Sequence, residues 1–166
     1  MRLRLSRLRG SPPDLAVEPG ERLLAWAVGA DGQTVGGTRQ ALYLGERRIP
    51  WEDVEAAEWD RDTSVLRVSE VGTWGQERPT HRVVLDEPGR LLELVRERVT
   101  ASIVLQRHVA VRGRKGVRVI ARRAPHSRGE IAWLLEYDAG IDPDDPLVRE
   151  VSERALADAA DEVHLG

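Results

Sequence analysis

The sequence predicts an α+β fold in which an antiparallel, β-rich lobe with one amphipathic helix precedes a smaller lobe of hairpin, strand and helix. Over residues 20–86, short apolar segments with period-2 alternation are separated by Gly, Asp and Pro turns. Two later segments carry apolar residues at helical spacing. With 166 residues, of which 41% are hydrophobic, the chain is long enough to bury a core of its own.

The first lobe is expected over residues 20–101, after an N-terminal part, residues 1–19, that reads as a basic arm or an edge strand. Residues 2–9 of that part interleave Arg with Leu and lead into a break at Ser11, Pro12 and Pro13. Strands are predicted at 22–28, 34–37 or 40–44, 53–59, 64–71 and 80–85. A helix fits residues 89–101, whose apolar stripe follows a start signal at Asp86 and Pro88.

The second lobe is expected over residues 102–166. Strands at 102–112 and 117–123 form a hairpin around Gly113 and Gly116, and a third strand spans 130–138. A last helix of about 17 residues begins after Asp145, which is a favourable N-cap before Pro146 at the first helical position. We expect this helix to cover the face of the sheet that carries Trp133.

The charges of the second lobe reverse in sign along the chain. Residues 107–128 hold seven Arg, one Lys and no acid, whereas residues 129–166 hold eleven Asp and Glu against two Arg. The formal net charge of −3 conceals this separation. It predicts either an anionic partner or an acidic tail that folds over the basic strands.

A resemblance to a known family rests on residues 41–68, which read ALYLGERRIPWEDVEAAEWDRDTSVLRV. An apolar strand, a turn from Ile49-Pro50 to Val54 and two further strands make this stretch similar to the bacterial branch of the pleckstrin-homology-like (PH-like) superfold. The similarity covers residues 20–101, where five strands are predicted against seven in that family. It implies a scaffold that binds proteins or anionic surfaces and is usually not catalytic. The whole chain also resembles a recurring group of short actinobacterial proteins.

Catalytic and metal-binding motifs are absent from the sequence. There is no Cys, no nucleophile elbow and no phosphate-binding glycine loop, and the four His residues lack ligand spacing. The acids of residues 138–145 lack the order of a calcium loop and are interpreted as turn and helix caps. We therefore expect no catalytic residues, no metal, no cofactor and a non-catalytic interaction module.

The basic hairpin is the predicted contact surface for an anionic group or a partner protein. Its candidate residues are Arg112, Arg114, Lys115, Arg118, Arg122 and Arg123. Trp74, in a loop between Gly72 and Gly75, is a further candidate contact. The alternatives are a nucleic-acid or ribosome-associated protein that uses the hairpin, a solvated face without a ligand, and an enzyme. A pI of about 5.9 and the lack of aromatic residues in residues 107–128 favour a protein partner over nucleic acid.

The expected location is the cytoplasm. No apolar stretch approaches the roughly 18 residues of a membrane span, so integral membrane association is not expected. The N-terminus lacks the apolar core of a secretory signal, and a chain without Cys has no disulfide framework.

Overall fold

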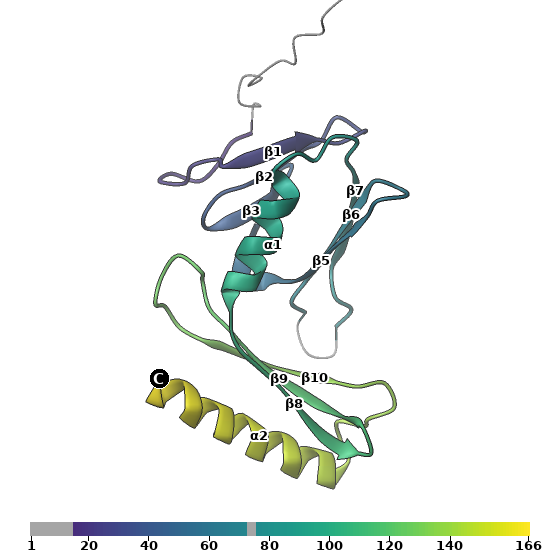
Figure 1. Cartoon of the computed structure of the whole chain (residues 1–166), viewed down its shortest axis with the longest axis vertical. Helices are drawn as coiled ribbons and strands as arrows, with labels where there is room; N and C mark the ends of the chain where they lie inside the picture. The colour runs from purple at the N-terminus through teal and green to yellow at the C-terminus, as the bar shows by residue number, and fades with distance from the viewer. Residues whose placement is uncertain (1–14, 73–75) are drawn as a thin grey trace, which may run out of the picture.

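A computed structural model describes residues 15–72 and 76–166, which form three antiparallel sheets and two α-helices. The α+β class expected from the sequence is confirmed. Two lobes follow one another along the longest axis of the molecule (Figure 1). We call residues 15–102 lobe 1 and residues 103–166 lobe 2. Residues 2–9 and Trp74, both singled out in the sequence, lie outside the described residues.

Lobe 1 contains two of the sheets. One has the order β1-β2-β3-β4 and the other β5-β6-β7, and a 3₁₀ turn at Trp51–Asp53 joins them. The strands are β1 (Ala25–Val28), β2 (Thr34–Gly37), β3 (Ala41–Leu44), β4 (Arg47–Pro50), β5 (Val54–Asp60), β6 (Val65–Glu70) and β7 (Thr80–Val84).

The described part of lobe 1 thus has seven strands, two more than the sequence predicted. Residues 34–37 and 40–44, treated as alternatives in the sequence, supply a strand each. Strand β4 was not predicted, because it is four residues long and two of its side chains are exposed Arg. A segment this short shows no clear alternation.

The core of lobe 1 lies between the two sheets and helix α1 (Leu91–Ser102), which confirms the predicted helix with a start two residues later. Val35 and Leu42 from one sheet, Val68 from the other and Leu91 from the helix are fully buried. Trp51 is also fully buried, and its indole Nε1 donates a 2.8 Å hydrogen bond to the carbonyl of Thr38. The 3₁₀ turn is therefore anchored in the core, where it directs the chain from the first sheet to the second.

Lobe 2 is a three-stranded sheet with the order β10-β9-β8, covered on one face by helix α2 (Pro146–Leu165). Its strands are β8 (Ile103–Arg112), β9 (Lys115–Arg122) and β10 (Ala132–Tyr137). The predicted hairpin and third strand are confirmed, and so is the packing of α2 on the face that carries Trp133, where Ala155 of α2 clusters with Val119 of β9. Arg112 pairs with Lys115, so the turn has two residues and begins at Gly113, whose φ of 61° suits glycine.

Candidate interaction surface

The basic strands of lobe 2 are held by the acidic residues that follow them in sequence. Arg107 of β8 pairs with Glu162 of α2. Arg112 Nη2 lies 2.6 Å from Asp145 Oδ2, and Arg118 Nη1 lies 3.7 Å from Glu136 Oε2. The acidic segment therefore folds over the basic strands, which is the second of the two arrangements that the charge reversal predicted.

Arg114 and Lys115 remain as the exposed cations at the tip of the hairpin. Among the described residues, neither has a carboxylate oxygen within 4.0 Å. Arg123 is half-buried, and its main-chain N–H donates to the carbonyl of Ser102 at 2.9 Å. The six candidate residues are thus divided among paired, open and interior positions and do not form one continuous basic patch.

Arg122 lies in the interior, in contrast to its predicted place on the contact surface. Its side chain is 3% exposed because β9 turns this position toward lobe 1. Nη1 donates to Ser102 Oγ at 3.1 Å and Nη2 donates to the carbonyl of Glu55 at 2.9 Å. Burial lowers the pKa of this guanidinium from its ordinary value. Arg122 connects the two lobes and is not accessible to a ligand in this arrangement.

The acids of residues 138–145 cap turns and the helix, as the sequence predicted. Asp145 Oδ1 accepts a 2.9 Å hydrogen bond from the main-chain N–H of Leu147, the N-cap contact of α2. Asp138 Oδ2 accepts from the main-chain N–H of Gly116 and bonds to His108, both at 2.8 Å. The bond from Arg112 to Asp145, and that from His108 to Asp138, lower the pKa of each carboxyl. No group of three or more His, Asp or Glu able to hold a metal occurs in the described ranges.

A different surface, which the sequence did not indicate, lies along strand β10. Within the described chain, β10 pairs only with β9, so its other edge has no strand neighbour. Residues 133–137 in succession line one cavity of about 480 Å³. Because successive side chains of a strand point to opposite faces, a cavity lined by five residues in a row follows the edge of the strand. The main-chain groups on this edge of β10 therefore face a cavity.

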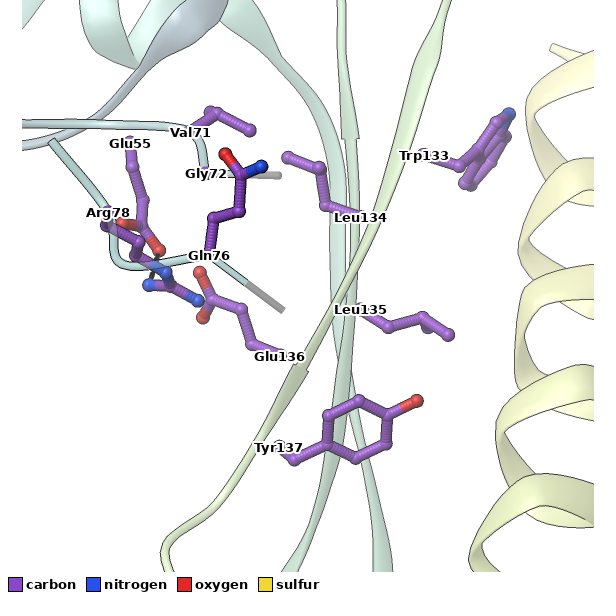
Figure 2. A pocket seen from close by; sticks show the side chains of 10 residues that line it. All are labelled: Glu55, Val71, Gly72, Gln76, Arg78, Trp133, Leu134, Leu135, Glu136 and Tyr137. Carbon is purple, nitrogen blue, oxygen red and sulfur yellow. Dashed lines mark hydrogen bonds and ion pairs between the residues drawn. The ribbon is translucent and has the colours of Figure 1, made fainter. Parts of the chain in front are cut away.

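One side of this edge borders an apolar groove against helix α2. Figure 2 shows Trp133, Leu135 and Tyr137 pointing toward α2. Two cavities of about 360 Å³ each adjoin here and share Glu153 and Leu156 as lining residues. Helix α2 lies over β8 and β9, so the β10 side chains are only half-buried. We call this the β10–α2 groove; its apolar lining is Trp133, Leu135, Tyr137, Leu156, Ala157 and Ala160.

The opposite side of β10 presents carboxyl groups toward lobe 1. Leu134 and Glu136 point away from α2, and Glu136 lies beside Glu55, which is ion-paired with Arg78 (Figure 2). Burial and the hydrogen bond with Glu136 raise the pKa of Glu55, against the opposing effect of Arg78. Two carboxyl groups in contact disfavour the ionised form of each other, and an additional cation here relieves that repulsion.

The sequence missed this surface because alternation identifies a strand but does not show whether the strand is central or at an edge. The apolar stripe of β10 was interpreted as core, and its residues are half-buried instead. The signal present in the sequence is the lack of Lys and Pro in AWLLEY, since natural edge strands commonly carry such residues to prevent pairing.

No family model, no curated protein and no solved structure matches this chain. None of the helices in residues 15–72 and 76–166 is both long and apolar enough to cross a membrane.

Proposed function

We propose that this protein is a non-catalytic interaction module that binds another protein chain along the open edge of β10 and in the β10–α2 groove. The observation that carries the proposal is that β10 pairs with β9 alone among the described strands, while its opposite side faces a cavity and its side chains border an apolar groove. Main-chain hydrogen bonds to an added strand supply affinity, and pockets for alternate side chains supply specificity.

Lobe 1 serves in this proposal as a PH-like scaffold. Support comes from its order of elements, a four-stranded sheet and a three-stranded sheet followed by helix α1, which matches the seven strands that the resemblance implied. The stretch that carries the resemblance, residues 41–68, runs from β3 into β6. The cysteine-free composition supports action in the cytoplasm.

A protein partner is favoured over nucleic acid because the basic strands are already paired with carboxylates. A phosphate backbone would have to displace Asp145 from Arg112 and Glu136 from Arg118. Residues 103–166 hold ten Arg and Lys against eleven Asp and Glu. Lobe 2 therefore lacks the excess of positive charge that is typical of domains that bind a phosphate backbone.

Nucleic acid is a second candidate because Arg114 and Lys115 are exposed cations without a carboxylate partner among the described residues. Anisotropy of a labelled 20-nucleotide RNA at 50 and 200 mM salt tests it. Under the main proposal, binding is weak and the variant with Arg114→Ser and Lys115→Ser behaves as the wild type. Micromolar binding that falls log-linearly with salt and is lost in this variant supports the second candidate instead.

A blocked groove tests the main proposal. Ala157 is an exposed residue of α2 that lines the groove, and Ala157→Arg fills the groove without altering the core. The matched control is Ala101→Arg, at an exposed position of α1. Wild type and control should retain a protein from nuclease-treated lysate that Ala157→Arg does not retain, and this protein, once purified, should slow hydrogen exchange at β10. Equal retention by all three proteins, or unchanged exchange at β10, contradicts the proposal.

A further inference from the structure

We propose that lobe 1 binds an amphipathic anion, a small molecule with one alkyl chain that ends in a carboxylate or phosphate group, in a cavity between strand β5 and helix α1. This site is separate from the β10–α2 groove and goes beyond the proposed function. An apolar cavity with a single charged residue at its opening carries the proposal.

The cavity opens into the side of the core of lobe 1. Its volume of about 540 Å³ lies in the range of pockets that hold small ligands. The apolar lining on the sheet side includes Ala57, Trp59 and Leu66, and that on the helix side is Leu92, Val95 and Val99. Leu66 and Val95 are buried, whereas the other four pack against the core and remain half-exposed. An alkyl chain in this cavity would remove that apolar surface from water.

Strand β5 leaves this space open because its side chains facing α1 are small and its edge is irregular. Within the described chain, β5 pairs only with β6. A shift of register between Val54 and Ala56 marks a bulge, and Ala56 and Ala57, which follow it directly, both line the cavity. Two successive residues of a regular strand would point to opposite faces. Two methyl groups fill little of the space between the strand and the helix, so the sequence of β5 creates the cavity.

The polar part of the lining favours an anionic group on the ligand. It consists of Arg96 and Thr100, which are exposed and lie four residues apart on one face of α1. No Asp or Glu lines the cavity, and among the described residues no carboxylate oxygen lies within 4.0 Å of Arg96. A guanidinium and a hydroxyl at the opening can together donate charge-assisted hydrogen bonds to a carboxylate or phosphate.

The rest of the lining favours an alkyl chain over a polar or heterocyclic ligand. Away from Arg96 and Thr100, the cavity presents only aliphatic side chains and the indole of Trp59. A ligand group that needs hydrogen bonds would lose its water there without finding a partner. The ligand that satisfies both parts of the site therefore has its charge at the opening and an unsubstituted chain inside.

Isothermal titration calorimetry of the full-length chain with decanoate tests the proposal. The affinities of octanoate, decanoate and dodecanoate should rise about fourfold with each added methylene, because each one leaves water for an apolar cavity. Decyltrimethylammonium, with the same chain length and the opposite charge, should bind roughly tenfold more weakly than decanoate. Comparison of decanoate with decyl phosphate identifies which of the two anionic groups the site prefers.

Two variants separate recognition of the charge from recognition of the chain. Arg96→Gln should weaken decanoate roughly fivefold and leave the binding of decanol unchanged, because it removes only an exposed cation. Ala57→Leu fills the cavity and should weaken both ligands. The matched control is Arg82→Gln, at an exposed position of β7 that does not line the cavity, and it should bind decanoate as the wild type does.

Ala157→Arg, which blocks the β10–α2 groove, should also bind decanoate as the wild type does. The absence of binding heat at millimolar decanoate overturns the inference, and so does equal affinity for decanoate and decyltrimethylammonium. Equal effects of Arg96→Gln and Arg82→Gln, or a loss of binding in Ala157→Arg, overturn it as well. The proposed function does not depend on these results, because its partner binds to lobe 2.

Discussion

Arg122 Nη2 donates a 2.9 Å hydrogen bond to the main-chain carbonyl of Glu55, so a buried cation of lobe 2 is bonded to strand β5 of lobe 1. The second donor, Nη1, reaches Ser102 Oγ at the end of α1. The two bonds fix β9 against both the last residue of the helix and the first residues of β5. The contact between the lobes therefore includes directional polar bonds.

Arg122→Ala should destabilise the protein, because it removes both bonds and leaves the partly buried carbonyl of Glu55 without this partner. We expect a loss of about 2 kcal/mol in the free energy of unfolding, measured by urea denaturation. Arg123→Ala is the control: it is the next residue, it is half-buried, and its contact with Ser102 is made by the main chain. An equal loss in both variants would contradict a specific role for Arg122.

Gly116→Ala should prevent the hairpin from forming in its present register. A Cβ at this position would lie 1.9 Å from the carbonyl oxygen of Val109 and 2.8 Å from Ala110 Cα. Both are backbone atoms, so no change of side-chain rotamer relieves the overlap. We expect a large decrease in Tm or insoluble protein. Gly129→Ala, whose Cβ would meet only Ser127 Oγ at 3.3 Å, should have a small effect, and similar behaviour of the two variants contradicts the register.

Asp145 should show separable contributions from the helix cap and the ion pair. Asp145→Asn retains an acceptor for the N–H of Leu147 but loses the charge opposite Arg112, whereas Asp145→Ala loses both contacts. The expected order of Tm is wild type, then Asp145→Asn, then Asp145→Ala. Arg112→Ala should match Asp145→Asn, and an Asn variant as unstable as the Ala variant would show that the cap contributes nothing.

Glu70 should make the stability of lobe 1 sensitive to acid. The carboxylate accepts hydrogen bonds from Arg47 Nε at 2.9 Å and Nη2 at 2.7 Å, and these bonds lower its pKa below the ordinary 4.5, although burial opposes them. A carboxyl whose pKa is lower in the folded state stabilises the fold above the unfolded pKa and loses this contribution as the pH falls. Glu70→Gln should therefore cost about 2 kcal/mol at pH 7, and the difference from the wild type should shrink below pH 4.5.

Urea denaturation between pH 3 and 7 measures this difference. Because His81 also bonds to Glu70, the comparison is repeated in a His81→Gln background. A difference that stays constant over this range, in both backgrounds, contradicts the assignment.

The elements of lobe 2 were predictable because each carries a strong local signal. Gly113 and Gly116 mark the hairpin, and Asp145 with Pro146 marks the start of α2. The charge reversal predicted either an anionic partner or contact between the acidic and basic segments, and the structure shows the contact. In lobe 1, strand β4 escaped prediction because Arg47 and Arg48 are exposed and Ile49 alone is fully buried. Four residues give too little pattern to separate a strand from a turn.

The candidate surface was less predictable, because it depends on contacts between distant parts of the chain. The sequence indicated Arg118 and Arg122 alike as contact residues, but only the docking of the lobes decides that Arg122 is buried and Arg118 is not. In the same way, the residues of β10 predict a strand, while its place at the edge follows from the order of the sheet.

The chain passes from α1 to β8 without a connecting loop, since the helix ends at Ser102 and the strand begins at Ile103. Because no loop separates α1 from β8, a small rotation of the helix also changes the direction of β8 and therefore the orientation of lobe 2. The direction of β8, and with it that of the hairpin and of β10, is therefore set where α1 ends. The hydrogen bonds of Arg122 to Ser102 and Glu55, and that of the Arg123 main chain to Ser102, hold lobe 2 in this orientation.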